Sequence, residues 1–538
     1  MRKKETVFIY VLPALIGIVG GITLSRLHRP DVEHHGQVLP DTKFGNFLAA
    51  QHAILTNDFE SAMIYSDKLQ DTELPVVSDV QTIAGFLNGV MPENAASLSK
   101  DKGLPARFVY DAYLVNQGDW AALHARHKSD DSALVAPFRI WPAIANNWRT
   151  NTFKFIDDLP TNDSWKSFIR GQIYAELGDT DKAIEHFSSV STSFMNINDY
   201  LYLMSFYTHH NRQDLADALR KDFTSRPVGM FMLEYDTIPD WNAYSGYANQ
   251  MAFSLVQTVS HTQILMHSDM AVLMLRFAQI SAPSFAQNTD AINYYLGQYF
   301  YTNGGDYHEL FKTIDRSSPF YLFTVLRDAD KTGDIASLKK VVKDYPLFVP
   351  ALNKLVGHYI QTGRKRAALS VINNAMSDEN LDEQGRAFFL KSRAYVYYAF
   401  GDYRAAQDDL DETFVVLVAD AEMRSLQAKL WAAQNKNIET AYDYAMQLIT
   451  YNPTNIMAWD TLCNVVAVRE GPLASLDLLE SISVMLETQS SLFVHMGDMY
   501  VLVGDYDSAR DAYMRAIDLS DDGLVVVPEI ERKLRKLK

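Results

Sequence analysis

A spacing of 34 or 35 residues between small side chains is the feature that most constrains the fold of this 538-residue chain. Ala406, Ala441, Ser475 and Ala509 follow one another at intervals of 35, 34 and 34 residues. A fixed period of this length is typical of proteins built from repeated helical units, each of which packs against the next. The spacing therefore predicts an extended array rather than three or four unrelated domains.

Two segments share a wider pattern of small and aromatic residues. Written as G-x2-Y-x3-G-x4-A-x3-[FY], the pattern covers residues 171–187 and 497–513. Small residues let two antiparallel helices approach closely, and aromatic rings fill the space between them. The second glycine, Gly178 or Gly504, suits the tight turn that joins the helices. The pattern predicts antiparallel helix pairs.

On these residues the sequence resembles the tetratricopeptide repeat (TPR) family, whose unit is a helix-turn-helix of 34 residues. The resemblance implies an all-α fold, a TPR-like α-solenoid of antiparallel helix pairs, with a TPR array over residues 350–520. Residues 521–538 are predicted to form a C-terminal capping helix that covers the last exposed apolar face. Lys429 and Cys463 replace the small glycine of the family, so we expect local distortion in their two units.

Residues 43–349 are interpreted as a divergent helical-repeat region. Shorter versions of the same turn occur at Asn57-Asp58-Phe59, Gly118-Asp119-Trp120 and Leu296-Gly297. Between residues 190 and 290 no repeat register survives, and Met, Phe and Tyr are dense. Because nothing there alternates with a period of two, we expect helices rather than strands.

The N-terminus predicts one membrane-spanning helix ahead of the repeats. Residues 1–24 are interpreted as a signal anchor, because Val7 to Leu24 carry no charge and would span about 27 Å as a helix. Residues 25–42 form a predicted polar stalk. The basic residues before the span favour a cytoplasmic N-terminus and an exported body. A cleaved signal peptide, which would leave a secreted soluble binding protein, and a buried helix are the alternatives.

The predicted location follows from this segment together with a second resemblance. The order of divergent repeats, regular repeats and a short basic tail resembles exported, membrane-anchored TPR proteins of Gram-negative bacteria. The resemblance implies a single-pass protein of the bacterial inner membrane with its repeat domain in the periplasm.

The charge and cysteine content exclude several classes of function. The net charge of −17 argues against nucleic-acid binding, which needs clustered Lys and Arg. A single cysteine, Cys463, excludes an intrachain disulfide and a cysteine-based zinc cage. Cys463 itself is expected to be an inert buried thiol.

Short matches to catalytic motifs do not add up to an active site. Ser97-Leu-Ser-Lys100, Tyr247-Ala-Asn249 and Lys331-Thr332-Gly333 occur in the order used by serine penicillin-recognising enzymes, but that chemistry needs a β-sheet. His308-Glu309 lacks a second histidine four residues on, and His124 with His127 has no recognisable carboxylate partner in the sequence. We therefore predict no enzymatic activity, no cofactor and no metal. The alternative is a helical enzyme or glycan-processing factor with its site in residues 43–330.

The remaining functional surface is the concave face formed by the first helix of each pair. The predicted function is a non-catalytic, membrane-tethered TPR scaffold that binds protein or peptide partners in the cell envelope. Lys391 and Asn464 lie on separate units and two carboxylates oppose them, so a clamp for a peptide carboxylate is not expected. The alternative is that these side chains pack on the chain's own helices. The predicted partner-binding residues are Phe388, Lys391, Tyr395, Tyr398, Leu426, Asp460, Asn464 and Asp498, with Met423, Leu430, Met457, Val494 and Val501 on the same predicted face.

Overall fold

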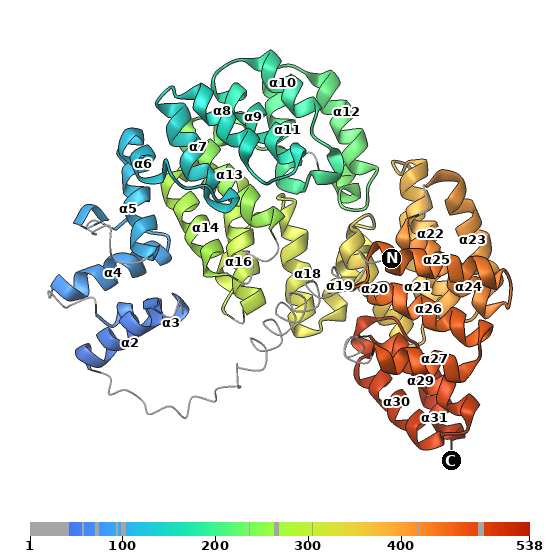
Figure 1. The fold of residues 1–538 in the computed structure, drawn as a ribbon. Helices are drawn as coiled ribbons and strands as arrows, with labels where there is room; N and C mark the ends of the chain where they lie inside the picture. The colour runs from blue at the N-terminus through green and yellow to red at the C-terminus, as the bar shows by residue number, and fades with distance from the viewer. Residues whose placement is uncertain are drawn as a thin grey trace, which may run out of the picture. The chain divides into compact units, whose positions relative to one another are not determined.

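The computed structural model describes most of the chain after the predicted stalk. The described residues are 42–55, 59–69, 75–92, 95–97, 104–235, 237–262, 268–303, 305–417, 420–482 and 489–537. All regular structure in these ranges is helical, as predicted (Figure 1). The predicted membrane helix and the stalk, apart from its last residue, lie outside these ranges. Within them, no helix combines the length and apolar character needed to span a bilayer.

The chain divides into two compact units, with the boundary between Val109 and Tyr110. The first unit has a small core of Phe47, Ala50, Leu69 and Val80. The predicted boundary at residue 350 separates divergent from regular repeats and falls inside the second unit. The elements of the first unit are α2 (Lys43–Leu55), α3 (Phe59–Asp67), α4 (Pro75–Leu87), η1 (Ala95–Ser97) and the start of α5 (Leu104–Asn116).

The second unit begins with the rest of α5 and a series of short helices. Gly118 adopts a positive φ after α5, and Asp119 caps the next helix, as the predicted turn requires. Helices α9 and α10 form an antiparallel pair. The elements are α6 (Trp120–His127), η2 (Ala133–Val135), α7 (Ala136–Ala145), α8 (Arg149–Asp158), α9 (Asp163–Glu176), α10 (Thr180–Ser188), η3 (Thr192–Phe194), α11 (Ile197–His209) and α12 (Gln213–Thr224).

The next part of the second unit departs from simple pairing because α13 is enclosed by other helices. It contacts α7, α9, α14, α15 and α16. The helices expected for residues 190–290 are therefore present, and the loss of a repeat register in the sequence coincides with this enclosed packing. The elements are η4 (Met230–Glu234), η5 (Trp241–Ala243), α13 (Tyr247–His261), α14 (Asp269–Ser281), α15 (Pro283–Thr289), α16 (Ala291–Asn303), α17 (His308–Lys312), α18 (Phe320–Thr332) and α19 (Ile335–Asp344).

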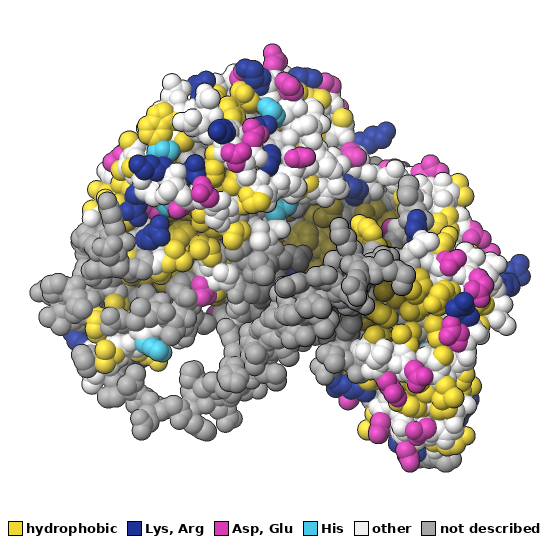
Figure 2. Space-filling view, in the orientation of Figure 1, with side chains coloured by type: hydrophobic (Ala, Val, Ile, Leu, Met, Phe, Trp, Pro, Cys, Tyr) yellow, Lys and Arg dark blue, Asp and Glu magenta, His cyan; other side chains and the backbone are white. Residues whose placement is uncertain are grey.

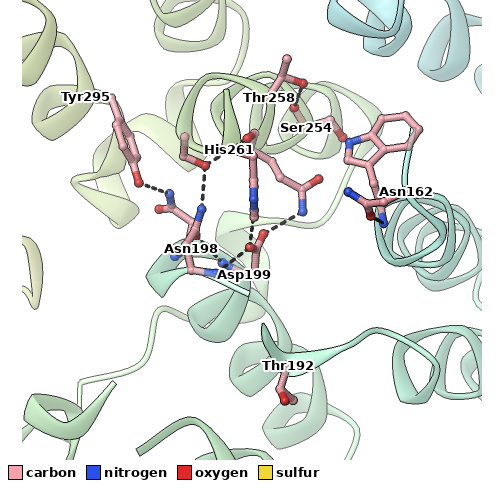
Figure 3. A network of polar contacts seen from close by, with 12 residues as sticks. Asn162, Thr192, Asn198, Asp199, Ser254, Thr258, His261 and Tyr295 are labelled. Carbon is pink, nitrogen blue, oxygen red and sulfur yellow. Dashed lines mark hydrogen bonds and ion pairs between the residues drawn. The ribbon is translucent and has the colours of Figure 1, made fainter. Parts of the chain in front are cut away.

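A network of polar side chains joins α11 to α13 in this part (Figure 3). The carboxylate of Asp199 is completely buried and accepts hydrogen bonds from Gln257 Nε2 at 2.7 Å and His261 Nε2 at 2.6 Å. Asn198 donates to the hydroxyl of Tyr295 on α16 at 2.9 Å. These contacts tie the three helices to one another, although the Oε1 atom of Gln257 is buried without a hydrogen-bond partner.

The C-terminal array, α20 to α30, consists of regular helix pairs in which each first helix contacts the first helix of the next pair. On the face seen in Figure 2, hydrophobic side chains gather over α21 and α26. The elements of the array and the segment after it are α20 (Val349–Gln361), α21 (Lys365–Met376), α22 (Glu383–Ala399), α23 (Tyr403–Val416), α24 (Ala421–Ala433), α25 (Ile438–Tyr451), α26 (Ile456–Arg469), α27 (Pro472–Ser481), α29 (Ser490–Val503), α30 (Tyr506–Asp518), η7 (Ser520–Asp522) and α31 (Val527–Lys536).

The small residues at the repeat period lie where the paired helices touch. Ala406, Ala441, Ser475 and Ala509 are all fully buried, as predicted. A Cβ atom added to Gly497 would lie 2.6 Å from the ring of Tyr513, so a side chain at this position would force the helices apart. Gly171 meets Phe187 and Gly297 meets Phe311 in the same way. The predicted pairing of small and aromatic residues is confirmed.

The turns between paired helices also follow the predicted chemistry. Gly504 ends α29 with a φ of 85°, a conformation that disfavours residues with a side chain. Asp505 then caps α30 by accepting a hydrogen bond from the amide of Ser508 at 3.1 Å. Lys331, Thr332 and Gly333 form the same kind of helix end after α18. Their resemblance to a penicillin-binding motif is therefore a coincidence of helix-turn chemistry.

The predicted distortion at Lys429 and Cys463 is wrong. Helices α24 and α26 run without interruption through both positions. Both side chains are buried, and the ammonium of Lys429 is paired with a carboxylate on α26. The array accommodates these two larger residues through local packing and pairing, with both helices unbroken.

Candidate functional site

A groove of about 930 Å³ lies inside the C-terminal array. Its walls come from the first helix of each pair, α20, α22, α24, α26 and α29, and from residues 522–533, which we call the C-terminal segment. The polar and aromatic side chains that line it are Asn353, Phe388, Lys391, Ser392, Tyr395, Tyr398, Tyr403, Glu422, Lys429, Asp460, Asn464, Gln489, Ser491, His495, Asp498, Asp522, Glu529 and Lys533.

The turn before the C-terminal segment reaches back to the first helix of the array and closes one side of the groove. Gln361 on α20 donates hydrogen bonds to Ser520 Oγ at 3.2 Å and Asp521 Oδ1 at 3.1 Å. Gly357 and Gly523 meet so closely that a Cβ atom on Gly523 would lie 2.7 Å from the Cα atom of Gly357. The first and last parts of the array are therefore in direct contact.

Seven of the eight predicted partner-binding residues line this groove, and Leu426 does not. Leu426 is fully buried in a core cluster with Ala394 and Ala406, as are Met423 and Leu430. The reason is the helical period, because these three residues share one stripe of α24. The groove is lined instead by another stripe of this helix. Partner binding by the other seven, which are Phe388, Lys391, Tyr395, Tyr398, Asp460, Asn464 and Asp498, stays a prediction.

Tyr395 and Tyr398 belong both to the groove wall and to the core behind it. Each ring is half-buried and packs against the cluster that contains Ala394. The hydroxyl of Tyr395 points toward the sulfur of Met457 at 4.0 Å, and burial raises the pKa of Tyr398. The alternative that predicted groove residues pack on the chain's own helices is thus correct in part. Removing both rings would change stability as well as any binding.

A buried ion pair forms part of the groove floor. The ammonium of Lys429 lies 2.5 Å from the carboxylate of Asp460, and both side chains are less than one-tenth exposed. Asp460 also accepts hydrogen bonds from Asn464 at 3.0 Å and Ser491 at 3.3 Å. Burial is the largest single influence and by itself lowers the pKa of Lys429. The charge and hydrogen bond of Asp460, together with Tyr395 and Tyr398, outweigh burial, so the pKa of Lys429 is raised. Sequence reasoning missed Lys429 as a groove residue, although a lysine at a glycine position was a usable signal.

His495 and Ser475 form a second polar contact beside this pair. The Nε2 atom of His495 lies 2.9 Å from Ser475 Oγ, which also donates to the backbone oxygen of Cys463 at 2.9 Å. Burial lowers the pKa of His495, so its imidazole is neutral at pH 7. Burial raises the pKa of the Cys463 thiol to about 12, so the thiolate that nucleophilic chemistry needs does not form. Cys463 is inert, as predicted.

The other groove lysines are paired as well. Lys391 on α22 contacts Glu422 on α24 at 2.8 Å and Asp420 at 3.1 Å. Lys533 on α31 contacts both oxygens of Asp498 on α29, at 2.6 and 2.7 Å. Each pair joins two neighbouring elements, so these charges hold the walls of the groove together.

Two polar clusters outside the array, around His127 and Asp199, lie away from the groove and from a second, smaller cavity. His127 lies between Asp111 at 2.8 Å and Asp130 at 2.7 Å, so the expectation that it lacks carboxylate partners is wrong. The chain brings these carboxylates from α5 and the turn after α6, which spacing alone does not show. Neither the groove nor a second cavity of about 350 Å³ beside Arg220 includes His127 or Asp199. Among the described residues, no group of His, Cys, Asp and Glu has the arrangement of a metal site.

The comparison with protein families supports the repeat assignment in two places. The tetratricopeptide repeat model matches residues 168–190 and 490–522. The first match covers most of α9 and α10, and the second covers α29 and α30 together with η7. These are the segments that carry the close contacts of Gly171 with Phe187 and of Gly497 with Tyr513. No curated protein matches the chain in sequence.

Solved structures of helical-repeat proteins overlap with the chain at low similarity. A tetratricopeptide repeat protein from Parabacteroides merdae ATCC 43184 is 16% identical, with a TM-score of 0.30, covering 54% of this chain and 99% of that protein. The APC/C hetero-tetramer Cut9–Hcn1 is 11% identical, with a TM-score of 0.34, and the match covers 91% of this chain and 95% of that chain. The structure of Naa15/Naa10 bound to HypK-THB is 13% identical, with a TM-score of 0.26, and the match covers 93% of this chain and 91% of that chain. Scores this low carry no argument about the partners of this chain.

Proposed function

We propose that this protein is a membrane-tethered TPR scaffold that holds a protein or peptide partner in the groove of its C-terminal array. The observation that carries the proposal is the convergence of the first helices on one groove of about 930 Å³, lined by aromatic and polar side chains. Aromatic side chains surrounded by polar groups are characteristic of protein-recognition surfaces. A groove of this volume suits an extended peptide or one helix of a partner.

The tether is the predicted signal anchor at residues 1–24, which would place the groove close to a membrane. The exported repeat domain and its envelope partner belong to the same proposal. In a carbonate wash of membranes, we expect the full chain to stay in the pellet with Met1 retained. Recovery of the protein in the soluble fraction with a new N-terminus near Ile22 would replace the tether with a cleaved signal.

A catalytic role in residues 43–330 receives less support. The titratable side chains that converge there form two pairs, Asp199 with His261 and Asp111 with His127, and all but His261, which is partly exposed, are buried. Neither of the two cavities described above reaches them. A reaction needs an accessible space in which a substrate meets such groups, so the scaffold is the better proposal.

Two alanines of α24 provide a matched test. Ala433 lines the groove, whereas Ala421, at the other end of the helix, does not, and both are exposed. We expect Ala433→Trp to fill part of the groove and reduce the partner recovered by crosslinking in intact membranes at least tenfold. Ala421→Trp should leave recovery unchanged. Equal recovery with both variants would show that the partner binds elsewhere.

A further inference from the structure

The positive charges of the groove are already neutralised by the chain itself. Among the residues that the structure describes, three lysines line it, Lys391, Lys429 and Lys533, and no arginine does. Each ammonium lies within 3.1 Å of a carboxylate on a neighbouring element. An acidic ligand would have to break one of these pairs before it could bind. The groove is therefore poorly suited to a peptide carboxylate or a phosphate.

The negative charges of the groove outnumber its positive charges. In the described part of the chain five carboxylates line it, those of Glu422, Asp460, Asp498, Asp522 and Glu529, against the three lysines. Glu529 is exposed on α31 and makes no ion pair with the residues that the structure describes. The groove wall thus includes a carboxylate that no described cation neutralises.

Two aromatic rings line the same groove as this carboxylate, those of Tyr398 and Tyr403. Their ring centroids lie 5.8 Å apart. Burial raises the pKa of Tyr403, and the negative charges of Glu529 and Asp498 raise it further. An ammonium or guanidinium group in such a groove is attracted both by a carboxylate and by the faces of tyrosine rings.

We propose that the groove selects an apolar peptide segment that carries a lysine or arginine, whose cation pairs with the carboxylate of Glu529. The inference rests on the proposed function, because it names the partner class of the same groove. The apolar flanks of the segment would contact the half-buried rings of Phe388 and Tyr395. Attraction to the uncompensated carboxylate would supply the selectivity for a basic residue.

The test uses a phage library of random 12-residue peptides selected on the full chain in detergent. We expect the selected peptides to be enriched in Lys or Arg next to large apolar residues. A labelled synthetic copy of the best peptide should bind at least tenfold more tightly than a copy with glutamine at the basic position. On the protein side, Glu529→Gln should lower the affinity for the basic peptide at least fivefold and leave the affinity for the glutamine peptide unchanged. Fluorescence polarisation measures all four affinities of this cycle.

Glu531→Gln is the matched control, because it removes the same charge from an exposed position of α31 that does not line the groove. It should bind the basic peptide like the unmodified protein, and a thermal melt should show both variants equally folded. Selection of acidic or uncharged peptides, or an equal effect of both variants, would overturn the basic specificity and leave the scaffold intact. If no peptide is selected, or binding survives Ala433→Trp, the groove is not a peptide site and the proposed function fails as well.

Discussion

The C-terminal array and the helices around α13 belong to the same compact unit but build their interiors differently. In the array, the second helix of each pair buries one stripe, as α25 does with Ala441, Ala445 and Leu448, and small residues at the repeat period bring paired helices together. Around α13, helices are buried on every side, including all residues from Gln250 to Val259 and from Ala271 to Ala278. A periodic interior needs the right side chain at a few fixed positions. An enclosed helix also buries polar groups, which need partners inside the protein; on α13 most of them have one, and Gln250 Nε2 and Gln257 Oε1 do not.

Buried charge follows the same division. Around α13, Asp199 is held by three separate donors, and burial lowers the pKa of Arg276 to about 10. In the array, the most deeply buried ion pair, Lys429 with Asp460, borders the groove. Buried polar groups thus connect packed helices in the first region and border the groove in the second. Three substitutions test this difference.

The largest effect is expected from Asp199→Ala. The change removes the acceptor for Gln257 Nε2, His261 Nε2 and the backbone amide of Asn196, all in the interior or at its edge. Leaving such donors unpaired costs about 3–5 kcal/mol. Hydrogen exchange should accelerate in residues 197–261 and stay unchanged in residues 490–516. Asp181→Ala, at an exposed position of α10, is the control and should leave exchange unchanged in both segments. If Asp199→Ala instead accelerated exchange uniformly over the whole chain, the two regions would not differ in the way proposed.

A smaller loss is expected from Lys429→Met in the array. Asp460 loses its ion pair but keeps the hydrogen bonds from Asn464 and Ser491, so we expect a cost of about 2–3 kcal/mol. Chemical denaturation measures this loss of stability, and hydrogen exchange shows whether it is concentrated in α24 and α26. The double variant Lys429→Met, Asp460→Leu should recover most of the loss, because no unpaired charge is left. A double variant less stable than Lys429→Met would show that the pair is needed for packing.

The smallest effect is expected from Ala509→Leu. Ala509 is fully buried between α29 and α30. The added side-chain atoms would overpack this contact and lower the free energy of unfolding by about 1–3 kcal/mol. A thermal melt of the variant should shift downward by several degrees. Asp511→Leu adds a similar side chain at an exposed position of the same helix and serves as the control. If the two variants melt alike, the repeat register does not define the helix contacts.

The regular repeats could be predicted because their information is local. Gly497 and Tyr513 lie on adjacent helices separated by one turn, so spacing along the chain is enough to pair them. Leu426 was misplaced because assigning a face of α24 needs the helix rotation to within about a third of a turn, which the spacing of small residues does not fix. His127 was misjudged for a different reason. One of its carboxylate partners, Asp111, is 16 residues away on another helix.

The amino-acid sequence by itself determined the helical class, the repeat period, the turns at Gly178 and Gly504, and the helices that would face the groove. These properties depend on side-chain size and backbone conformation within about 35 residues of the chain. The tertiary structure alone decided that Lys429 is paired with Asp460 and that residues 520–523 return to α20. It also showed that Glu529 is left without an ion pair among the described residues. Charge pairing depends on which residues the packed helices bring within a few ångströms of one another, and this follows from the packing of the whole array.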